Sequence, residues 1–163
     1  MPRVLIAGIG NVLRGDDGFG PAVIAALERA GDLPANATTA DCGTGGFTLV
    51  RELLDGYEAL VIVDAVDRGG PPGTVYLLQP TVPAVDAIDG AERRRLAADM
   101  HNAVPDRALL LARAAGVLPA RVWIVGCQPD ETEEFSTDLS APVGAAVIRA
   151  LNAIRSIVQV VTA

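Results

Sequence analysis

The sequence predicts an α/β fold, a three-layer α/β/α arrangement around a mostly parallel, five-stranded sheet. Five short apolar segments alternate with segments whose apolar residues recur at helical spacing, an order typical of parallel sheets with helices on both faces. The short segments are continuous apolar runs, which indicates strands buried on both faces. No repeat, linker or low-complexity stretch divides residues 1–163, so we expect a single domain.

The predicted strands are defined by apolar runs that end in glycine or in a polar residue. The strongest is ALVIV at residues 59–63, which leads directly into Asp64. The first run, at residues 4–7, ends in a glycine-rich turn. The other predicted strands are residues 37–42, 74–78 and 121–125.

Helices are predicted at residues 21–29, 47–54, 102–115 and 141–158. Pro21 suits the first turn of the first helix, Asp16 or Asp17 is a reasonable cap for it, and Gly31 is suited to end it. Residues 80–98 contain several Pro and Arg residues without a clear period. We expect a loop there that includes a helical turn.

The composition excludes several classes of function. The net charge is −7, which disfavours nucleic acids and anionic membranes as partners. All 13 basic residues are Arg, so a P-loop lysine, a Schiff-base lysine and a Ser–Lys dyad are excluded. Two cysteines without a CxxC motif make no disulfide framework. No signal peptide or membrane span is expected, so we expect a cytoplasmic protein.

Acidic residues follow several predicted strands. In open α/β sheets, ligands bind outside the carboxyl ends of the strands. Here those ends carry glycines, which let backbone approach closely, together with several carboxylates. The first strand is followed by Asp16 and Asp17, the second ends at Asp41 and Cys42, and the third is followed by Asp64. The sequence therefore predicts a carboxylate-rich site at this edge of the sheet.

Two common site types fit this edge poorly. A dinucleotide site needs G-x-G-x-x-G; Gly8 and Gly10 match, but Leu13 stands at the third position and two aspartates follow it. A nucleophilic site lacks a suitable nucleophile, because no serine sits in a G-x-S-x-G elbow. Cys42 and Cys127 lie in acidic surroundings and are interpreted as small buried residues.

Metal binding fits better than these alternatives. Asp17, Asp64 and His101, the only histidine, offer two carboxylates and one imidazole. Such a set suits a first-row divalent ion with open positions for water or substrate. Each residue also has a simpler interpretation: Asp17 as a helix cap, Asp64 as a turn former and His101 as a cap or surface residue. Spacing alone leaves these alternatives open.

The order of motifs resembles that of the hydrogenase maturation peptidases. The first motif is GIGNVLRGDDGFG at residues 8–20. It is followed by DCGT at 41–44, VIVDA at 61–65, HN at 101–102 and GCQPD at 126–130. The resemblance implies a phosphorylase/hydrolase-like fold with a mixed five-stranded sheet, one strand being antiparallel. Residues 74–78 are the candidate for that strand.

The resemblance also implies an activity and a set of site residues. Members of the family are endopeptidases that remove a C-terminal extension from the precursor of a [NiFe] hydrogenase large subunit once nickel has been inserted. The family's metal-contacting positions match Asp17, Asp64 and His101; the first is Glu in some relatives. Asp41 matches a position that guides cleavage, and Cys42 replaces a glycine found in some relatives. Asp17, Asp64, His101 and Asp41 are thus the candidate catalytic residues of an aspartyl-type endopeptidase.

These implications set the expected cofactor and partners. We expect no tightly bound cofactor at rest, because nickel arrives with the precursor, and we expect water rather than a protein nucleophile to attack. The partner is the large-subunit precursor, with no nucleic acid and no membrane, and the protein is expected to be a monomer. One alternative is a non-catalytic, metal-dependent chaperone of the precursor. A nucleotide-binding module is a third hypothesis, opposed by the incomplete glycine pattern.

Overall fold

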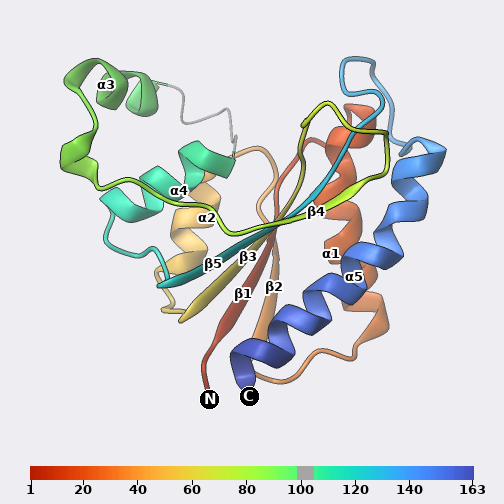
Figure 1. Ribbon diagram of the computed structural model, residues 1–163, viewed down its shortest axis with the longest axis horizontal. Coiled ribbons are helices and arrows are strands. Elements are labelled where there is room, and N and C mark those ends of the chain that lie inside the picture. Colours follow the sequence, from red (N-terminus) through yellow and green to blue (C-terminus); the bar gives the residue numbers. More distant parts are fainter. Residues whose placement is uncertain (99–104) are drawn as a thin grey trace.

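The computed structural model describes residues 1–98 and 105–163, and a five-stranded sheet forms the centre of this part of the chain (Figure 1). The order across the sheet is β2-β1-β3-β5-β4; β4 is antiparallel to β5 and the other neighbours are parallel. The predicted α/β class and the antiparallel strand at 74–78 are confirmed. The strands are β1 (Val4–Gly8), β2 (Ala37–Asp41), β3 (Ala59–Ala65), β4 (Val75–Leu78) and β5 (Arg121–Cys127).

Helices cover both faces of the sheet (Figure 1). Helices α1 (Phe19–Ala30) and α5 (Ala141–Thr162) pack on one face, and α2 (Gly46–Leu53) and α4 (Pro105–Ala114) on the other. Along β1, Val4 and Ile6 enter the first core while Leu5 and Ala7 enter the second. This double burial explains the continuous apolar run, because each large aliphatic side chain gains about 1.5–3 kcal/mol when fully buried.

Helix α5 carries the largest part of the first core. By length and composition alone, it is the one helix of the described residues that is apolar enough to cross a membrane. One side of it packs on the sheet and α1 through Val143, Ala150, Ile154 and Val158, all of them buried. Arg149 and Arg155 interrupt its apolar sequence. The buried residues recur at helical spacing along one side of α5, so α5 is a core helix that covers one face of the sheet.

The expectation of a loop with a helical turn at 80–98 is correct for the first half of the segment and wrong for the second half. The segment contains a 3-10 turn, η2 (Val85–Ala87), and a helix, α3 (Gly90–Ala98). The Asp89 side chain accepts a hydrogen bond from the Glu92 N–H at 2.8 Å, so Asp89 caps α3. An Asp followed three residues later by Glu is a helix-start signal, but α3 lacks the apolar period on which the prediction relied. The helix predicted at 102–115 is observed from Pro105; residues 102–104 lie outside the described residues.

The start of α1 differs from the prediction, whereas its end agrees with it. Neither Asp16 nor Asp17 caps α1; its N-cap is Gly18, and a 3-10 turn, η1 (Gly15–Gly18), precedes the helix. Both carboxylates are engaged elsewhere, as described below. Pro21 lies in the first turn as predicted. Gly31 ends the helix in a left-handed conformation, with its N–H bonded to the Leu27 carbonyl at 3.1 Å.

Candidate active site

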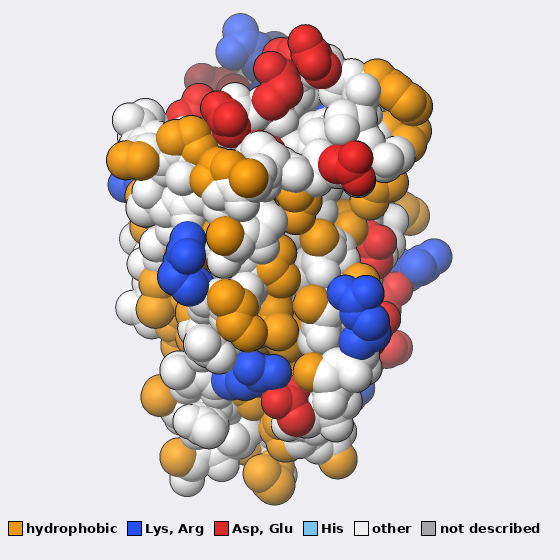
Figure 2. All heavy atoms as spheres, turned by 90° about the vertical axis from the view of Figure 1, so that its right-hand side faces the viewer, with side chains coloured by type: hydrophobic (Ala, Val, Ile, Leu, Met, Phe, Trp, Pro, Cys, Tyr) orange, Lys and Arg blue, Asp and Glu red, His pale blue; other side chains and the backbone are white. Residues whose placement is uncertain are grey.

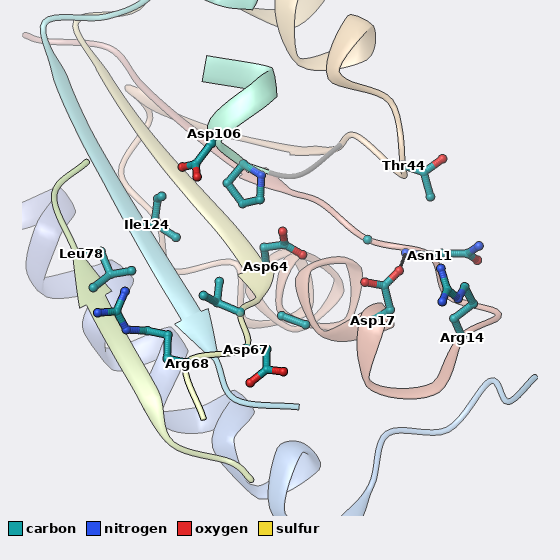
Figure 3. Close-up of a pocket in the computed structure, with 14 residues that line it drawn as sticks. Asn11, Arg14, Asp17, Thr44, Asp64, Asp67, Arg68, Leu78, Asp106 and Ile124 are labelled. Atoms are coloured by element: carbon teal, nitrogen blue, oxygen red, sulfur yellow. Dashed lines mark hydrogen bonds between the residues drawn. The ribbon is translucent and has the colours of Figure 1, made fainter. Parts of the chain in front are cut away.

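The candidate site lies in a cavity at the point where the winding of the sheet changes direction. From β1 the chain passes to β2 on one side and then to β3 on the other, so the carboxyl ends of β1 and β3 flank a switch point. A cavity of about 700 Å³ lies there (Figure 3). Its wall is formed by Gly10, Asn11, Arg14, Asp17, Thr44, Asp64, Ala65, Val66, Asp67, Arg68, Leu78, Pro105, Asp106 and Ile124.

The glycines of the first motif bring η1 against the strand ends. A Cβ on Gly10, whose φ is +142°, would collide with the carbonyl oxygen of Asp17. A Cβ on Gly20 would collide with the carbonyl oxygens of Ile9 and Val63. These glycines therefore allow close backbone packing. The same packing places Asp17 beside the end of β3.

Asp17 projects into the cavity from η1 (Figure 3). Its Oδ2 accepts a hydrogen bond from the Asn11 N–H at 2.9 Å. That bond fixes the carboxylate but leaves its other oxygen with no described protein donor. Asp17 is therefore oriented by the loop after β1 and keeps coordination capacity free for a ligand.

Asp64 stands at the end of β3 and is almost fully buried, with 5% of its surface exposed. Burial raises the pKa of the Asp64 carboxyl well above its usual value, and the charge of Asp17 raises it further. A hydrogen bond from the Ala65 backbone offsets only part of this. Two converging acids, one of them costly to ionise, form a site that a cation would stabilise.

The structure brings together two of the three predicted metal-contacting residues. His101 lies outside the described residues. Within residues 1–98 and 105–163, no group of three or more His, Cys, Asp or Glu side chains is arranged to hold a metal ion. Pro105 and Asp106, which follow His101 by four and five positions, line the cavity. The role of His101 stays a prediction.

Asp41 ends β2 at the same edge of the sheet but does not line the cavity. Its Oδ1 accepts a hydrogen bond from the Gly43 N–H at 2.9 Å, which closes an Asx turn. The turn leads to Thr44, which does line the cavity. Asp41 thus shapes the loop beside the site, and its predicted part in cleavage stays a prediction.

Both cysteines are buried, as the sequence interpretation expected. Burial raises the pKa of the Cys42 thiol to about 12, and the charges of Glu52 and Asp41 add to the effect. Burial likewise raises the pKa of Cys127 to about 11. Thiols with such pKa values stay protonated at neutral pH and are poor nucleophiles. They pack in the cores on the two faces of the sheet.

Sequence reasoning missed the role of Asp16, which is buried and faces away from the cavity. Burial alone would raise the pKa of the Asp16 carboxyl, but hydrogen bonds from Ser140, Asp130 and Glu131 outweigh it and lower the pKa. The Ser140 N–H and hydroxyl donate at 2.7 and 2.8 Å, and the Asp130 and Glu131 N–H groups at 2.8 and 3.1 Å. Asp16 thereby ties η1 to the loop between β5 and α5.

Gln128 is a second residue that the sequence did not single out. It is buried, and its Oε1 accepts hydrogen bonds from the Arg68 N–H at 2.8 Å, the Gly70 N–H at 3.2 Å and the Tyr76 hydroxyl at 3.0 Å. Its Nε2 donates to Asp67 Oδ1 at 2.8 Å. This amide therefore fixes the loop after β3, which forms one wall of the cavity. The sequence motif GCQPD includes Gln128, but nothing in the motif indicated that this side chain is buried and makes four hydrogen bonds.

The surface around the strand ends is acidic. Figure 2 shows Asp and Glu side chains gathered at the end of the molecule where the parallel strands terminate. The loop after β5 contributes exposed acids, among them Glu131, Glu133 and Glu134. The potential at this end favours cationic ligands over anionic ones.

Comparisons with known proteins agree on one family. Residues 21–157 match the family model described as hydrogenase maturation protease. The chain is 35% identical to the hydrogenase expression/formation protein HupD of Rhizobium leguminosarum bv. viciae, over 99% of this chain and 79% of that protein. A hydrogenase 2 maturation peptidase from Thaumarchaeota archaeon SCGC_AB-539-E09 superposes with a TM-score of 0.69 at 34% identity, covering 96% and 98% of the two chains. The hydrogenase maturating endopeptidase HybD from E. coli gives 0.72 at 25% identity, covering 96% and 92%.

Proposed function

The chain belongs to the hydrogenase maturation protease family, and we propose that it removes the C-terminal extension of a [NiFe] hydrogenase large-subunit precursor after nickel has been inserted. The chain is a peptidase. Its site supports this role because Asp17 and Asp64 converge in a cavity at the switch point of the sheet. The observation that carries the proposal is that an almost fully buried carboxyl group, Asp64, lines the same cavity as a second one, Asp17.

Nickel enters this proposal as part of the substrate. Asp17 and Asp64 supply two carboxylates, and His101 supplies an imidazole as third ligand, a mixed set suited to a first-row divalent ion. The metal would supply an anchor and a Lewis acid near the scissile bond. A precursor without nickel would offer the two acids nothing to bind, so it would stay uncut.

Water is the proposed attacking group. The buried thiols have raised pKa values, and none of the three serines lies in a nucleophile elbow. A carboxylate such as Asp41, at the edge of the same site, is a candidate to orient or deprotonate the water. The enzyme would then be of the aspartyl type, with no covalent acyl intermediate.

We propose that the protein works as a cytoplasmic monomer whose partner is the precursor. The net charge of −7 opposes binding to nucleic acid or to anionic lipid.

The test compares nickel-loaded with nickel-free precursor in the presence of the enzyme and weighs the precursor by mass spectrometry. Cleavage of the loaded form alone is expected from the wild type. Asp17→Asn, Asp64→Asn and His101→Ala should abolish cleavage, whereas Asp86→Asn, an exposed acid outside the cavity, should not. Equal cleavage of both precursors, or full activity of the three variants, would overturn the proposal. A stable complex without mass loss would identify the chaperone alternative instead.

A further inference from the structure

Arg68 and two apolar side chains line the side of the cavity opposite Asp17 (Figure 3). Asn11 and Asp17 lie on the η1 side and Asp64 lies between the two ends. Beyond Asp64, on the β4–β5 side, the wall is formed by Arg68 and by the apolar side chains of Leu78 and Ile124. Asp67 and Asp106 line the cavity as well, so the guanidinium of Arg68 lies beside an apolar surface within a cavity that acids border on several sides.

Arg68 is held in place from behind by a buried amide. Its backbone N–H donates to Gln128 Oε1 at 2.8 Å, and its Cζ lies 5.6 Å from the centroid of the Tyr76 ring. The Tyr76 hydroxyl donates to the same Gln128 oxygen at 3.0 Å. One buried side chain thus positions both the residue that carries the guanidinium and the ring beside it.

The guanidinium of Arg68 makes no ion pair with any acid in the part of the chain that the structure describes. Arg14, the other arginine in the wall, is engaged: it pairs with Glu133 at 3.2 Å and donates to the Thr132 carbonyl at 3.0 Å. Asp67, next to Arg68 in sequence, bonds Gln128 instead. Arg68 is therefore a positioned cation with free donors in a cavity otherwise rich in acids.

We propose that Arg68 binds a carboxylate on the C-terminal extension of the substrate, and that Leu78 and Ile124 contact the apolar side chain next to it. This inference deepens the proposed function and rests on it. A cavity of about 700 Å³ admits a few residues of extended chain but no folded domain, so the extension is the part that enters. Its negative charge would be repelled by Asp17, Asp64 and the other acids unless a cation receives it.

A guanidinium suits this task because its planar fork matches a carboxylate with two parallel hydrogen bonds. The carboxylate is either an Asp or Glu side chain of the extension or its terminal α-carboxylate. Both present the same chemistry to Arg68. The experiment therefore separates the two sources by changing the extension.

The first part of the test is steady-state cleavage of the nickel-loaded precursor by Arg68→Gln and Arg68→Glu. Arg68→Gln should raise KM about tenfold with kcat unchanged, and Arg68→Glu should raise KM further, because the pair acts in binding. Arg29→Gln and Arg29→Glu, in the exposed last turn of α1 and outside the cavity, are matched controls and should leave KM unchanged. Thermal unfolding of each variant shows that it is folded.

The second part changes the precursor. In one set each acidic residue of the extension becomes its amide, and in another two serines follow its last residue and displace the α-carboxylate. The change that removes the carboxylate should raise KM for the wild type and leave KM of Arg68→Gln unaltered. Where a side chain is the source, replacing it by Arg should restore cleavage by Arg68→Glu.

Two results would overturn the inference. One is wild-type KM and kcat in both Arg68 variants. The other is an equal response of wild type and Arg68→Gln to every altered extension. Either result leaves nickel-dependent cleavage by the wild type intact, so it refutes the role of Arg68 without touching the proposed function. Loss of cleavage, or its independence of nickel, in the wild type would refute the proposed function itself.

Discussion

Two adjacent aspartates should respond to the same substitution in opposite ways. Asp16→Asn should lower the free energy of unfolding by about 3 kcal/mol and leave the folded protein able to cleave. Asp17→Asn should change the free energy of unfolding by less than about 1 kcal/mol and abolish cleavage. The contrast follows from what each carboxylate contacts, since one is buried behind the site and the other faces the cavity.

The magnitude for Asp16 comes from its four hydrogen bonds. Oδ1 accepts from the Ser140 N–H, and Oδ2 accepts from the Asp130 N–H, the Glu131 N–H and the Ser140 hydroxyl. In Asp16→Asn, an amide oxygen at the Oδ2 position can still accept three of these hydrogen bonds, but without a negative charge. The amide NH2 group then occupies the Oδ1 position, where it faces the Ser140 N–H and leaves that donor without an acceptor. One unsatisfied buried donor costs about 1–3 kcal/mol, and each charge-assisted bond loses about 0.5 kcal/mol when it becomes neutral.

The Asp17 carboxylate makes one such bond, from the Asn11 N–H at 2.9 Å, and an Asn side-chain oxygen can accept it. The assay is urea unfolding followed by circular dichroism, with cleavage measured on the same samples. Because the folded state lowers the pKa of Asp16, its stabilisation is present above the unfolded pKa and is lost as pH falls through the folded one. The difference between wild type and Asp16→Asn should therefore shrink below about pH 4. Equal destabilisation by the two variants would refute this reasoning.

Three further predictions concern the buried acid, the glycines and the thiols. The raised pKa of Asp64 makes the cation-free wild type lose stability as pH rises from about 4 through the folded pKa. Asp64→Asn should abolish that loss and raise Tm at pH 7; an unchanged profile of Tm against pH would contradict this. Gly20→Ala should lower the free energy of unfolding by more than about 2 kcal/mol, because its Cβ would meet two backbone oxygens. Gly144→Ala, with open space on α5, should instead raise it by about 0.5–1 kcal/mol, and urea unfolding of both variants measures the difference. Cys42 and Cys127 should resist iodoacetamide at pH 8 in the folded protein and react in urea, as mass spectrometry would show; rapid labelling of the folded protein would contradict their burial.

The fold was predictable because its signals are local and repeated. The run ALVIV at β3 is apolar at every position because both faces of that strand are covered, and the same holds for β1. The end of helix α1 was predictable from Gly31. Helix α3 was missed because it has no apolar stripe: its start depends on the Asp89 cap, and most of its described side chains are exposed.

The site was predictable only in part. Glycines and acids at strand ends were enough to locate it, because strand polarity places those ends at one edge of the sheet. The same signals could not tell Asp16 from Asp17, since neighbours on a tight turn point in different directions that depend on partners distant in sequence. The partners of Asp16 come from residues 130–140, and those of Arg68 include Gln128 and Tyr76. Such long-range contacts leave no local pattern.

The proximity of Asp64 and Asp17 couples the protonation of Asp64 to the binding of a cation in the proposed reaction. A buried carboxyl beside a second acid resists ionisation, so the site without a cation is neutral at Asp64 or repulsive when both acids are charged. A cation that enters with the substrate would offset both the cost of ionising Asp64 and the repulsion between the two carboxylates. It would bind most tightly when both acids are ionised. Binding of the loaded precursor should therefore release a proton from the site when Asp64 ionises. Isothermal titration in buffers of different ionisation enthalpy would detect that proton for the wild type, and Asp64→Asn should abolish it.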